Sequence, residues 1–368
     1  GVTARRPPAL PWPATKSDPW YKGRVKAILL NGAKNLESGN IQPQELGPRD
    51  VRIKVRTMGI CGSDVEYYLH NRIGPFVPQG PLALGHELAG TVVEVGPEAD
   101  QSIAGARVAI DPSIPCRACE FCRIGRHNLC TNLRFVGTAA TVPHIPGGLA
   151  EEVVVPAANC FVIPDELSFG EGACLEPLSV AVHAALRPGS IAGAHTLVSG
   201  GGTIGQFVAL VARAFGAASV TVSDLQSFRR EFALGQGADA AVDPIQEGDL
   251  AEASERVGGF DVVFEASGAP PAIRSALDVV KRGGTIVQIG SIAEEVQAPL
   301  NVIMTKELRY MGTFRYGDIY PISLNLLSTR RVDVRPLISA TFPVDDVVEA
   351  FELAAARSNS VKVQVEHA

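Results

Sequence analysis

Hydrophobic and polar residues alternate along much of the first half of the chain. The clearest example is Val51-Arg52-Ile53-Lys54-Val55, and similar stretches, separated by glycine and proline, run from Val25 to about Ile163. Because successive side chains of a strand point to opposite faces, a period of two is typical of strands with one buried face. The pattern therefore predicts a strand-rich, barrel-like domain.

A different pattern begins at about His195, where short apolar runs alternate with segments of helical period. The order is HTLVSGG, GQFVALVARAFGA, SVTVSD, SFRREFALGQGA, FDVVFEASG, PPAIRSALDVVKRGG and GTIVQIG. Strands that alternate with helices are joined by crossovers, which predicts an α/β domain with a doubly wound parallel sheet. We place GTIVQIG at the end of the first run of this sheet. In that position its apolar edge would be exposed unless it were covered or paired with a second subunit. This predicts a homo-oligomer, either a dimer or a tetramer.

The remainder of the chain is expected to return to the first domain. The six-strand sheet is complete by about Arg315, and a helix, ISLNLLSTRR, and a last strand, VKVQVEH, follow. The predicted organisation is a Pro-rich tail at residues 1–23, a strand-rich domain at residues 24–177 and 317–368, and a dinucleotide-binding domain at residues 178–316.

Composition and charge exclude several classes of protein. The 368 residues are 46% hydrophobic and 20% charged, and the formal net charge of -6 speaks against nucleic acid or an anionic membrane as a partner. The longest uncharged stretch, Thr196 to Ala212, contains four glycines, so it is read as a turn between two elements and not as a membrane span. Seven cysteines, four of them within fifteen residues, do not form a secreted disulfide pattern and favour a reducing, cytoplasmic setting.

These four clustered cysteines have the spacing of a metal site. They form C-x2-C-x2-C-x7-C, at Cys116, Cys119, Cys122 and Cys130. Four thiolates close a tetrahedral zinc site and leave no position for a substrate, so we expect a structural zinc ion here. Arginines in the same loop offset the surplus negative charge, at Arg117, Arg123 and Arg126.

A glycine-rich turn follows the first strand of the predicted parallel sheet. The sequence from Gly200 to Gly205 is G-x-G-x-x-G, and Asp224 closes the next strand. Glycines allow a tight turn and a close approach of pyrophosphate, and the carboxylate binds the ribose hydroxyls, which favours NAD over NADP. Arg229 and Arg230 reduce that preference, since an arginine near this strand end accepts a 2'-phosphate. The predicted cofactor-binding residues are Gly200, Gly202, Thr203, Ile204, Gly205, Asp224 and Arg229.

The stretch LGHELAG places His86 and Glu87 side by side among apolar residues. One interpretation is a core histidine bonded to a carbonyl and a glutamate that faces solvent. The other is a metal site, completed by Cys61 in GICGSD upstream and by Glu176 in ACLEPLSVAVHAA downstream. A cysteine, a histidine and a carboxylate leave one zinc position open for a substrate, as in catalytic zinc sites.

Taken in order, these motifs resemble the zinc-dependent medium-chain alcohol and polyol dehydrogenases, from about Val25 to the C-terminus. They are CGSD, GHE, the four-cysteine lobe, EPLS and the glycine turn. The resemblance implies a GroES-like catalytic domain into which the Rossmann domain is inserted. It implies Cys61, His86 and Glu87 as ligands of catalytic zinc, with Glu176 as a fourth ligand or as a holder of the zinc-bound water.

Within this family the chain resembles the sorbitol and xylitol dehydrogenases, and the segment RFVGTAATVPHIPGGLAE resembles the L-idonate 5-dehydrogenases. The positions that match the substrate pocket are Tyr67, Phe135, Thr138, Arg315 and Tyr316. Glu66 departs from the histidine that relatives often carry, which leaves the preferred substrate open.

Three further roles are expected around the predicted zinc ion. Ser63 is placed to pass a proton outward. Asp64 is read either as a partner of the free His86 nitrogen or as a surface or capping residue. Because a second carboxylate ligand would make the site negative, we expect Glu176 to exchange with water or substrate. Cys160 and Cys174 are read as buried apolar thiols.

The expected function is hydride transfer from a secondary alcohol of a polyol or sugar acid to NAD, with one catalytic and one structural zinc ion. A short-alcohol or threonine dehydrogenase on the same scaffold is one alternative. A zinc- and NAD-binding protein without turnover is another. The substrate, the hydroxyl that reacts and the physiological direction stay open.

Overall fold

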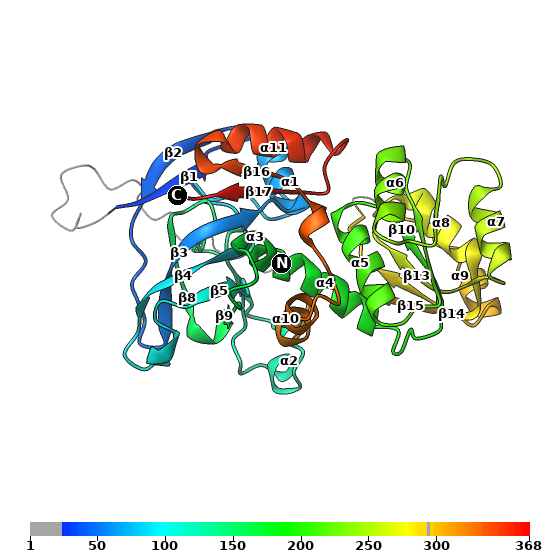
Figure 1. The fold of residues 1–368 in the computed structure, drawn as a ribbon, viewed down its shortest axis with the longest axis horizontal. Helices are drawn as coiled ribbons and strands as arrows, with labels where there is room; N and C mark the ends of the chain where they lie inside the picture. The colour runs from blue at the N-terminus through cyan, green and yellow to red at the C-terminus, as the bar shows by residue number, and fades with distance from the viewer. Residues whose placement is uncertain (1–23, 293–294) are drawn as a thin grey trace, which may run out of the picture.

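The computed structural model describes residues 24–292 and 295–368, so the predicted tail lies outside the described residues. A strand-rich body and a body with a parallel sheet lie side by side, and both the first and the last described strands belong to the former (Figure 1). The strands of the strand-rich body are β1 (Val25–Leu30), β2 (Leu36–Ile41), β3 (Asp50–Gly59), β4 (Glu87–Val95), β5 (Arg107–Ile110), β6 (Ser113–Ile114), β7 (Arg134–Phe135), β8 (Glu152–Pro156), β9 (Cys160–Val162), β16 (Ile338–Pro343) and β17 (Lys362–Glu366). Its helices are α1 (Gly62–His70), α2 (Glu120–Arg123), α3 (Phe169–Ala173), α4 (Leu175–Leu186), α10 (Tyr320–Ser328) and α11 (Val347–Ala356).

The largest sheet of this body combines strands from both ends of the described chain. Its order is β16-β17-β3-β4-β5-β9, and β8 also pairs with β3. The alternation predicted in β3 is present, because Val51, Ile53 and Val55 are fully buried in one apolar cluster. The last strand, β17, lies between β16 and β3, so the prediction that the end of the chain returns to this domain is confirmed.

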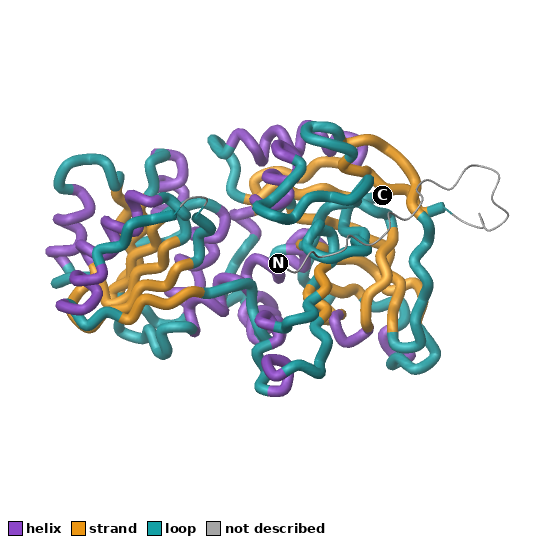
Figure 2. The backbone as a smooth tube through the Cα atoms, turned by 180° about the vertical axis from the view of Figure 1, so that it is seen from behind, coloured by secondary structure: helices purple, strands orange, loops and turns teal. Residues whose placement is uncertain are grey.

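The second body is a doubly wound parallel sheet, as predicted, with the order β12-β11-β10-β13-β14-β15. Figure 2 shows helices on both of its sides. Alternate strand residues face two different apolar clusters: Val198 packs with α4 and α5, whereas its neighbour Leu197 packs with α7 and α8. The elements are β10 (His195–Ser199), α5 (Thr203–Ala214), β11 (Ser219–Ser223), α6 (Ser227–Gly235), β12 (Ala240–Val242), α7 (Asp249–Arg256), β13 (Phe260–Glu265), α8 (Pro270–Val279), β14 (Val280–Gln288), α9 (Leu300–Thr305) and β15 (Arg309–Gly312).

The position expected for the strand GTIVQIG is wrong. This segment belongs to β14, which pairs with both β13 and β15, so it is an inner strand of the sheet. The edge is β15, whose four residues are exposed or half-buried. A strand so short carries no clear alternation, so the sequence pattern did not place β15 at the edge of the six-strand sheet.

The two bodies share one apolar cluster. It contains Leu178 of α4 and Phe207 of α5 together with Tyr320 of α10. Because the cluster crosses the expected boundaries at residues 177/178 and 316/317, those boundaries stay a prediction. Within the described part of the chain, no helix combines the length and apolarity that crossing a membrane needs.

Candidate active site and metal centres

The side chains of Cys61, His86 and Glu87 lie close together, although Cys61 and His86 are 25 positions apart in the sequence. Their ligand atoms, a sulfur, a ring nitrogen and a carboxylate oxygen, all lie within 4.8 Å of one another. Cys61 caps the start of α1, and Glu87 is the first residue of β4. His86 precedes that strand, so strand alternation does not separate the two side chains, and both reach the same point.

Asp64 fulfils both roles that the sequence left open. It is fully buried, and its Oδ2 accepts a hydrogen bond from the Cys61 backbone N–H at 3.0 Å, which caps α1. Its Oδ1 lies 3.5 Å from His86 Nδ1, and neither atom has another hydrogen-bond partner among the described residues. With Nδ1 turned to Asp64, Nε2 is the nitrogen available to a metal ion.

Glu87 has a neighbour that sequence reasoning missed. The ammonium group of Lys362, in β17, lies 2.7 Å from Glu87 Oε1 and 2.6 Å from Oε2. Both side chains are buried, with exposed fractions of 2% for Lys362 and 1% for Glu87. Lys362 alternates with valines in VKVQVE, a pattern that indicates a solvent-facing lysine. However, β17 is an inner strand and both its faces are covered.

Glu176 lies in the first turn of α4, close to this group but outside the set of three. Burial raises the pKa of Glu176 to about 7, and His86 acts in the opposite direction. The charged groups that act on its pKa are two predicted ligands, His86 and Glu87, together with Lys362. Whether it binds zinc directly stays a prediction.

The side chains predicted to bind substrate surround the same place. The guanidinium of Arg315 lies 3.9 Å from the ring centre of Phe135, whose ring is 5.7 Å from that of His86. Tyr67 is buried on α1, and burial raises its pKa, so its hydroxyl keeps its proton at neutral pH. Ser63 is half-buried in the first turn of α1, and its hydroxyl has no hydrogen-bond partner in the described part of the chain.

Tyr316, a predicted pocket residue, and Glu66, the departure noted beside the pocket, both have partners within the protein. The hydroxyl of Tyr316 donates to Asp111 Oδ1 at 3.3 Å. The carboxylate of Glu66 pairs with Arg357 at 3.1 Å and lies 3.8 Å from His70. Glu66 is therefore already neutralised within the protein, which lowers its influence on substrate charge.

The four cysteines of the predicted structural site also converge. The sulfur atoms of Cys116, Cys119, Cys122 and Cys130 lie within 4.8 Å of one another. Backbone N–H groups of Cys122 and Thr131 lower the pKa of the Cys119 thiol to about 6, which favours a thiolate. Of the remaining thiols, Cys174 is buried as expected but Cys160 is half-buried. Burial raises the pKa of each to about 12.

The glycine turn lies between β10 and α5, at the carboxyl ends of the parallel strands. A Cβ atom at Gly205 would lie 1.8 Å from the carbonyl oxygen of Gly200, so no other residue fits there. The chain continues from β10 to β11 on one side and later to β13 on the other, which makes this the switch point of the sheet. Dinucleotides bind at such switch points in doubly wound sheets.

Asp224 follows β11 and contacts this turn directly. Its Oδ2 accepts a hydrogen bond from the Gly201 backbone N–H at 2.8 Å, and its Oδ1 accepts one from the Gln226 N–H at 2.9 Å. Gln206, which the sequence analysis missed, donates to the carbonyl oxygen of Gly201 at 3.0 Å. Asp224 thus shapes the turn, and its contact with the ribose stays a prediction.

Residues of the cofactor domain also bond to the segment before β17. The hydroxyl of Thr203 donates to the carbonyl oxygen of Val361. Arg229 donates to the carbonyl oxygen of Arg357 at 2.9 Å, and its other terminal nitrogen lies 3.4 Å from Asp224 Oδ2. Arg229 therefore contacts residues of both bodies, Arg357 in the strand-rich body and Asp224 in the cofactor domain.

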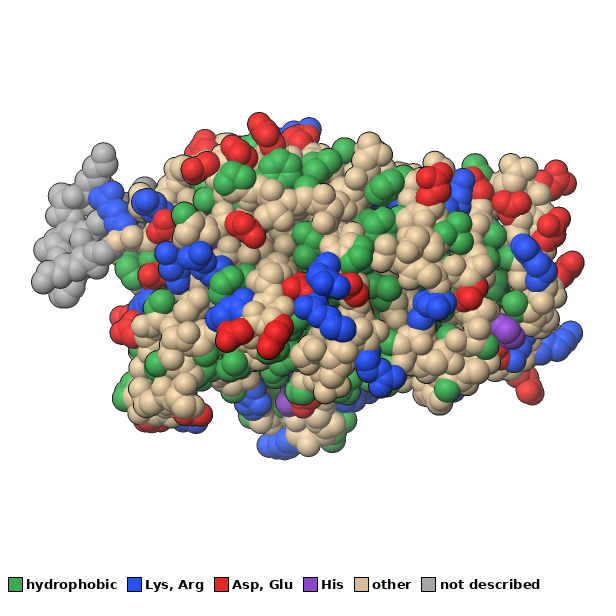
Figure 3. All heavy atoms as spheres, viewed as in Figure 1, with side chains coloured by type: hydrophobic (Ala, Val, Ile, Leu, Met, Phe, Trp, Pro, Cys, Tyr) green, Lys and Arg blue, Asp and Glu red, His purple; other side chains and the backbone are tan. Residues whose placement is uncertain are grey.

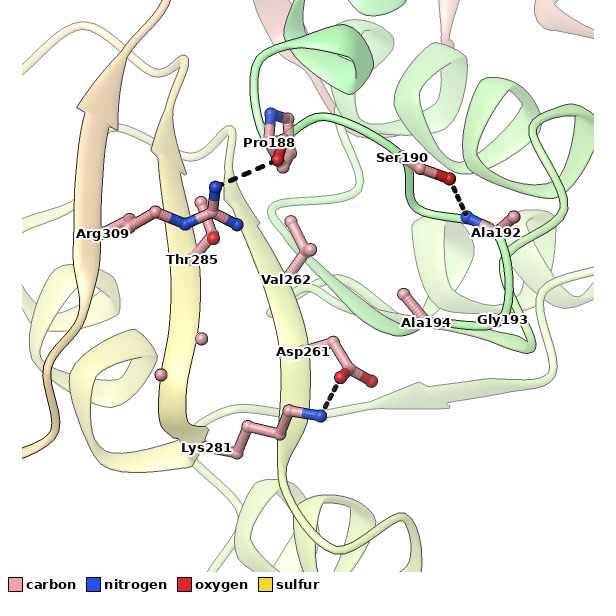
Figure 4. Close-up of a pocket in the computed structure, with 12 residues that line it drawn as sticks. Pro188, Ser190, Ala192, Gly193, Ala194, Asp261, Val262, Lys281, Thr285 and Arg309 are labelled. Atoms are coloured by element: carbon pink, nitrogen blue, oxygen red, sulfur yellow. Dashed lines mark hydrogen bonds and ion pairs between the residues drawn. The ribbon is translucent and has the colours of Figure 1, made fainter.

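A hollow of about 270 Å³ occurs elsewhere in the cofactor domain (Figure 4). Its lining includes Ala194, just before β10, and Arg309, the first residue of β15. It therefore lies at the amino ends of the strands, opposite the glycine turn. Asp261 and Lys281 form an ion pair within it, and Arg309 donates to the Pro188 carbonyl oxygen at 3.2 Å. It is separate from the dinucleotide site.

Both side-chain sets fit zinc. A thiolate, an imidazole and a carboxylate suit an open catalytic site, and four thiolates suit a closed structural one. On the face of the molecule drawn in Figure 3, acidic and basic side chains are interspersed, without a basic stripe of the kind that binds nucleic acid.

We predict different effects for two cysteine substitutions. Cys61→Ser should remove one zinc ion and the activity while the fold persists, because an open site is held by a scaffold. Cys119→Ser should lower the melting temperature, because a closed four-thiolate site folds its own loop. Metal analysis and thermal unfolding measure both effects. Equal melting temperatures for the wild type and Cys119→Ser would contradict the second.

Asp224→Ala should weaken NAD binding and improve the use of NADP relative to NAD. The change removes a ribose acceptor and the repulsion of a 2'-phosphate, and it also frees the Gly201 N–H. The ratio of kcat/KM for the two cofactors is the measurement, and an unchanged ratio would place the discrimination elsewhere.

The comparisons with known proteins agree with this geometry. The profile of the alcohol dehydrogenase GroES-like domain matches residues 47–165, and that of the zinc-binding dehydrogenase domain matches residues 203–329. The chain is 39% identical over 337 residues to sorbitol dehydrogenase from Rattus norvegicus, covering 90% of this chain and 93% of the relative. It is 38% identical over 348 residues to L-idonate 5-dehydrogenase from Vitis vinifera, with coverages of 92% and 93%.

The crystal structure of L-idonate 5-dehydrogenase from Escherichia coli superposes with a TM-score of 0.88 at 30% identity, covering 94% of this chain and 98% of that one. The expected fold, a Rossmann domain inserted in a GroES-like catalytic domain, is thereby confirmed. The chain belongs to the zinc-binding alcohol dehydrogenase family.

Proposed function

We propose that the protein is an NAD-dependent zinc dehydrogenase that oxidises a secondary alcohol of a polyol or sugar acid. The observation that carries this proposal is the convergence of Cys61, His86 and Glu87 next to Arg315, which stacks on Phe135. The names of the relatives, sorbitol dehydrogenase and L-idonate 5-dehydrogenase, support the same substrate class.

Each predicted site residue has a role in this reaction. Zinc would supply a Lewis acid that makes a bound hydroxyl more acidic, since it lowers the pKa of bound water to about 7, and NAD would accept the hydride. Cys61, His86 and Glu87 hold the metal, and Asp64 orients His86. Ser63 receives the proton of the alcohol and passes it outward.

The buried charges around this site support an active metal centre. The Cys61 thiolate and the carboxylates of Glu87 and Glu176 are three negative charges, and the ammonium of Lys362 is one positive charge. The fully buried Asp64 carboxylate beside His86 adds a further acidic group, so acidic groups outnumber the one ammonium and the site favours a cation. Because burial raises the pKa of Glu176 to about 7, its charge changes near neutral pH, and its expected exchange with water or substrate stays a prediction.

Arg315 argues against a short-alcohol dehydrogenase, because a small apolar alcohol offers nothing for a guanidinium to bind, but it does not argue against a threonine dehydrogenase, whose substrate has a carboxylate. A binding protein without turnover would need only the four-cysteine zinc ion. A panel of sorbitol, xylitol, galactitol and L-idonate, followed by NADH absorbance, tests the proposal. Zinc content separates the last alternative, since two zinc ions per chain favour the enzyme and one favours the binding protein.

We further propose a cytoplasmic homo-oligomer. All seven cysteines are free thiols, which fits a reducing compartment. Among the described residues, β15 pairs only with β14 and leaves one side of the parallel sheet open. Pairing of this edge with that of a second subunit would cover it.

Arg315→Lys should distinguish the two substrate types. A carboxylate uses the two-pronged fork of arginine, whereas a single hydroxyl does not, so a sugar acid should lose more than the matching polyol. A charge-assisted bond is worth roughly 1.5 to 3 kcal/mol, which corresponds to a loss of about ten- to a hundredfold in kcat/KM. Equal losses for both substrates would favour a neutral polyol.

Light scattering at micromolar concentration should give a mass of two or four chains. A proline at Gly312, the last residue of β15, should shift the mass towards one chain, because the N–H of Gly312 points away from β14 and proline removes this donor from the open edge. A monomeric wild type would remove the oligomer proposal.

A further inference from the structure

Lys362 is a buried lysine whose three N–H bonds are all used. Its Nζ donates to both carboxylate oxygens of Glu87, at 2.7 and 2.6 Å, and to the carbonyl oxygen of Ile60 at 3.0 Å. A lysine ammonium has three donors and no acceptor, so its hydrogen-bonding capacity is complete. The group joins the end of β3, the start of β4 and β17 at one point.

The Glu87 carboxylate is also confined by the backbone of β3. Gly59 pairs with Glu87 across β3 and β4. A Cβ atom at Gly59 would lie 2.2 Å from Glu87 Oε2, so the carboxylate occupies the space that any side chain there would need. Gly59 and Lys362 together leave this carboxylate little freedom to rotate.

Stability alone does not account for the pair. Removing two charges from water costs several kcal/mol per ion, and apolar residues of similar volume are often equally or more stabilising. A buried ion pair that includes a predicted zinc ligand instead resembles the hydrogen-bond partners of metal ligands in other proteins. Those partners fix the position of the atom that binds the metal.

We propose that Lys362 is a positioning residue of the catalytic metal centre, which fixes the Glu87 carboxylate so that Cys61, His86 and Glu87 form one ready-made zinc site. This inference rests on the proposed function, because it requires zinc at these three residues. Lys362 itself touches neither the metal nor the substrate.

The test measures the release of zinc from the purified holoenzyme to a chromophoric chelator. Lys362→Met removes the ammonium but keeps the side-chain length, and Lys362→Arg keeps a donor pair for the carboxylate. Lys306→Met is the matched control, because Lys306 also bonds to three oxygens, the carbonyls of Leu277, Asp278 and Val280, but within the cofactor domain.

Lys362→Met should release one of its two zinc ions about ten- to a hundredfold faster than the wild type, the usual effect of losing such a partner. The ion of the four-cysteine lobe should leave at the wild-type rate in every variant. Lys362→Arg should restore slow release, and Lys306→Met should lower stability without changing either rate.

Release from Lys362→Met that is unchanged or slower would overturn the inference, since a slower rate means that the ammonium competes with zinc for Glu87. If Lys362→Met does not fold, Gly59→Ala is the second variant, because its Cβ atom displaces the Glu87 carboxylate. Unchanged zinc release from Gly59→Ala would overturn the inference equally. A wild-type protein with a single zinc ion would instead contradict the proposed function.

Discussion

The compensation of buried charge is the constraint on which the rest of the site depends. The carboxyl groups of Asp64, Glu87 and Glu176 and the ammonium of Lys362 are buried where the strand-rich body meets the start of α4. Such groups coexist only when each is bonded or faces an opposite charge. The contributing residues come from segments far apart in the chain, so the sheet order β17-β3-β4 is what brings them together. The fold and the chemistry are therefore parts of one electrostatic arrangement.

The motifs that were predictable are those whose residues lie near one another in sequence. Four cysteines within fifteen residues indicate a metal site wherever the loop lies, and the glycine turn is defined by six adjacent residues. Cys61, His86 and a carboxylate were first connected as an open zinc site by their ligand chemistry, and the family resemblance then assigned Cys61, His86 and Glu87 as the ligands. The doubly wound sheet was predictable from the regular alternation of strands and helices. This alternation is recognisable even when the ends of individual elements are assigned incorrectly.

The features that were missed depend on long-range pairing. The alternation in VKVQVE is typical of a strand with a solvent-facing lysine. Lys362 is buried because its strand, β17, lies between β16 and β3. The true edge strand was overlooked because Arg309–Gly312 is too short to show a period. Likewise, nothing in the sequence indicates that Asp224 bonds the Gly201 N–H, since that contact depends on the closeness of two strand ends.

The distance along the chain between Glu87 and its ammonium partner has a consequence for biosynthesis. The two residues are 275 positions apart, and ribosomes add about 5 to 20 residues per second, so roughly 15 to 55 s separate their synthesis. Cys130 completes the four-cysteine lobe long before that interval ends. In a nascent chain all four cysteines of the lobe are therefore present while the strand that carries Lys362 has still to be made.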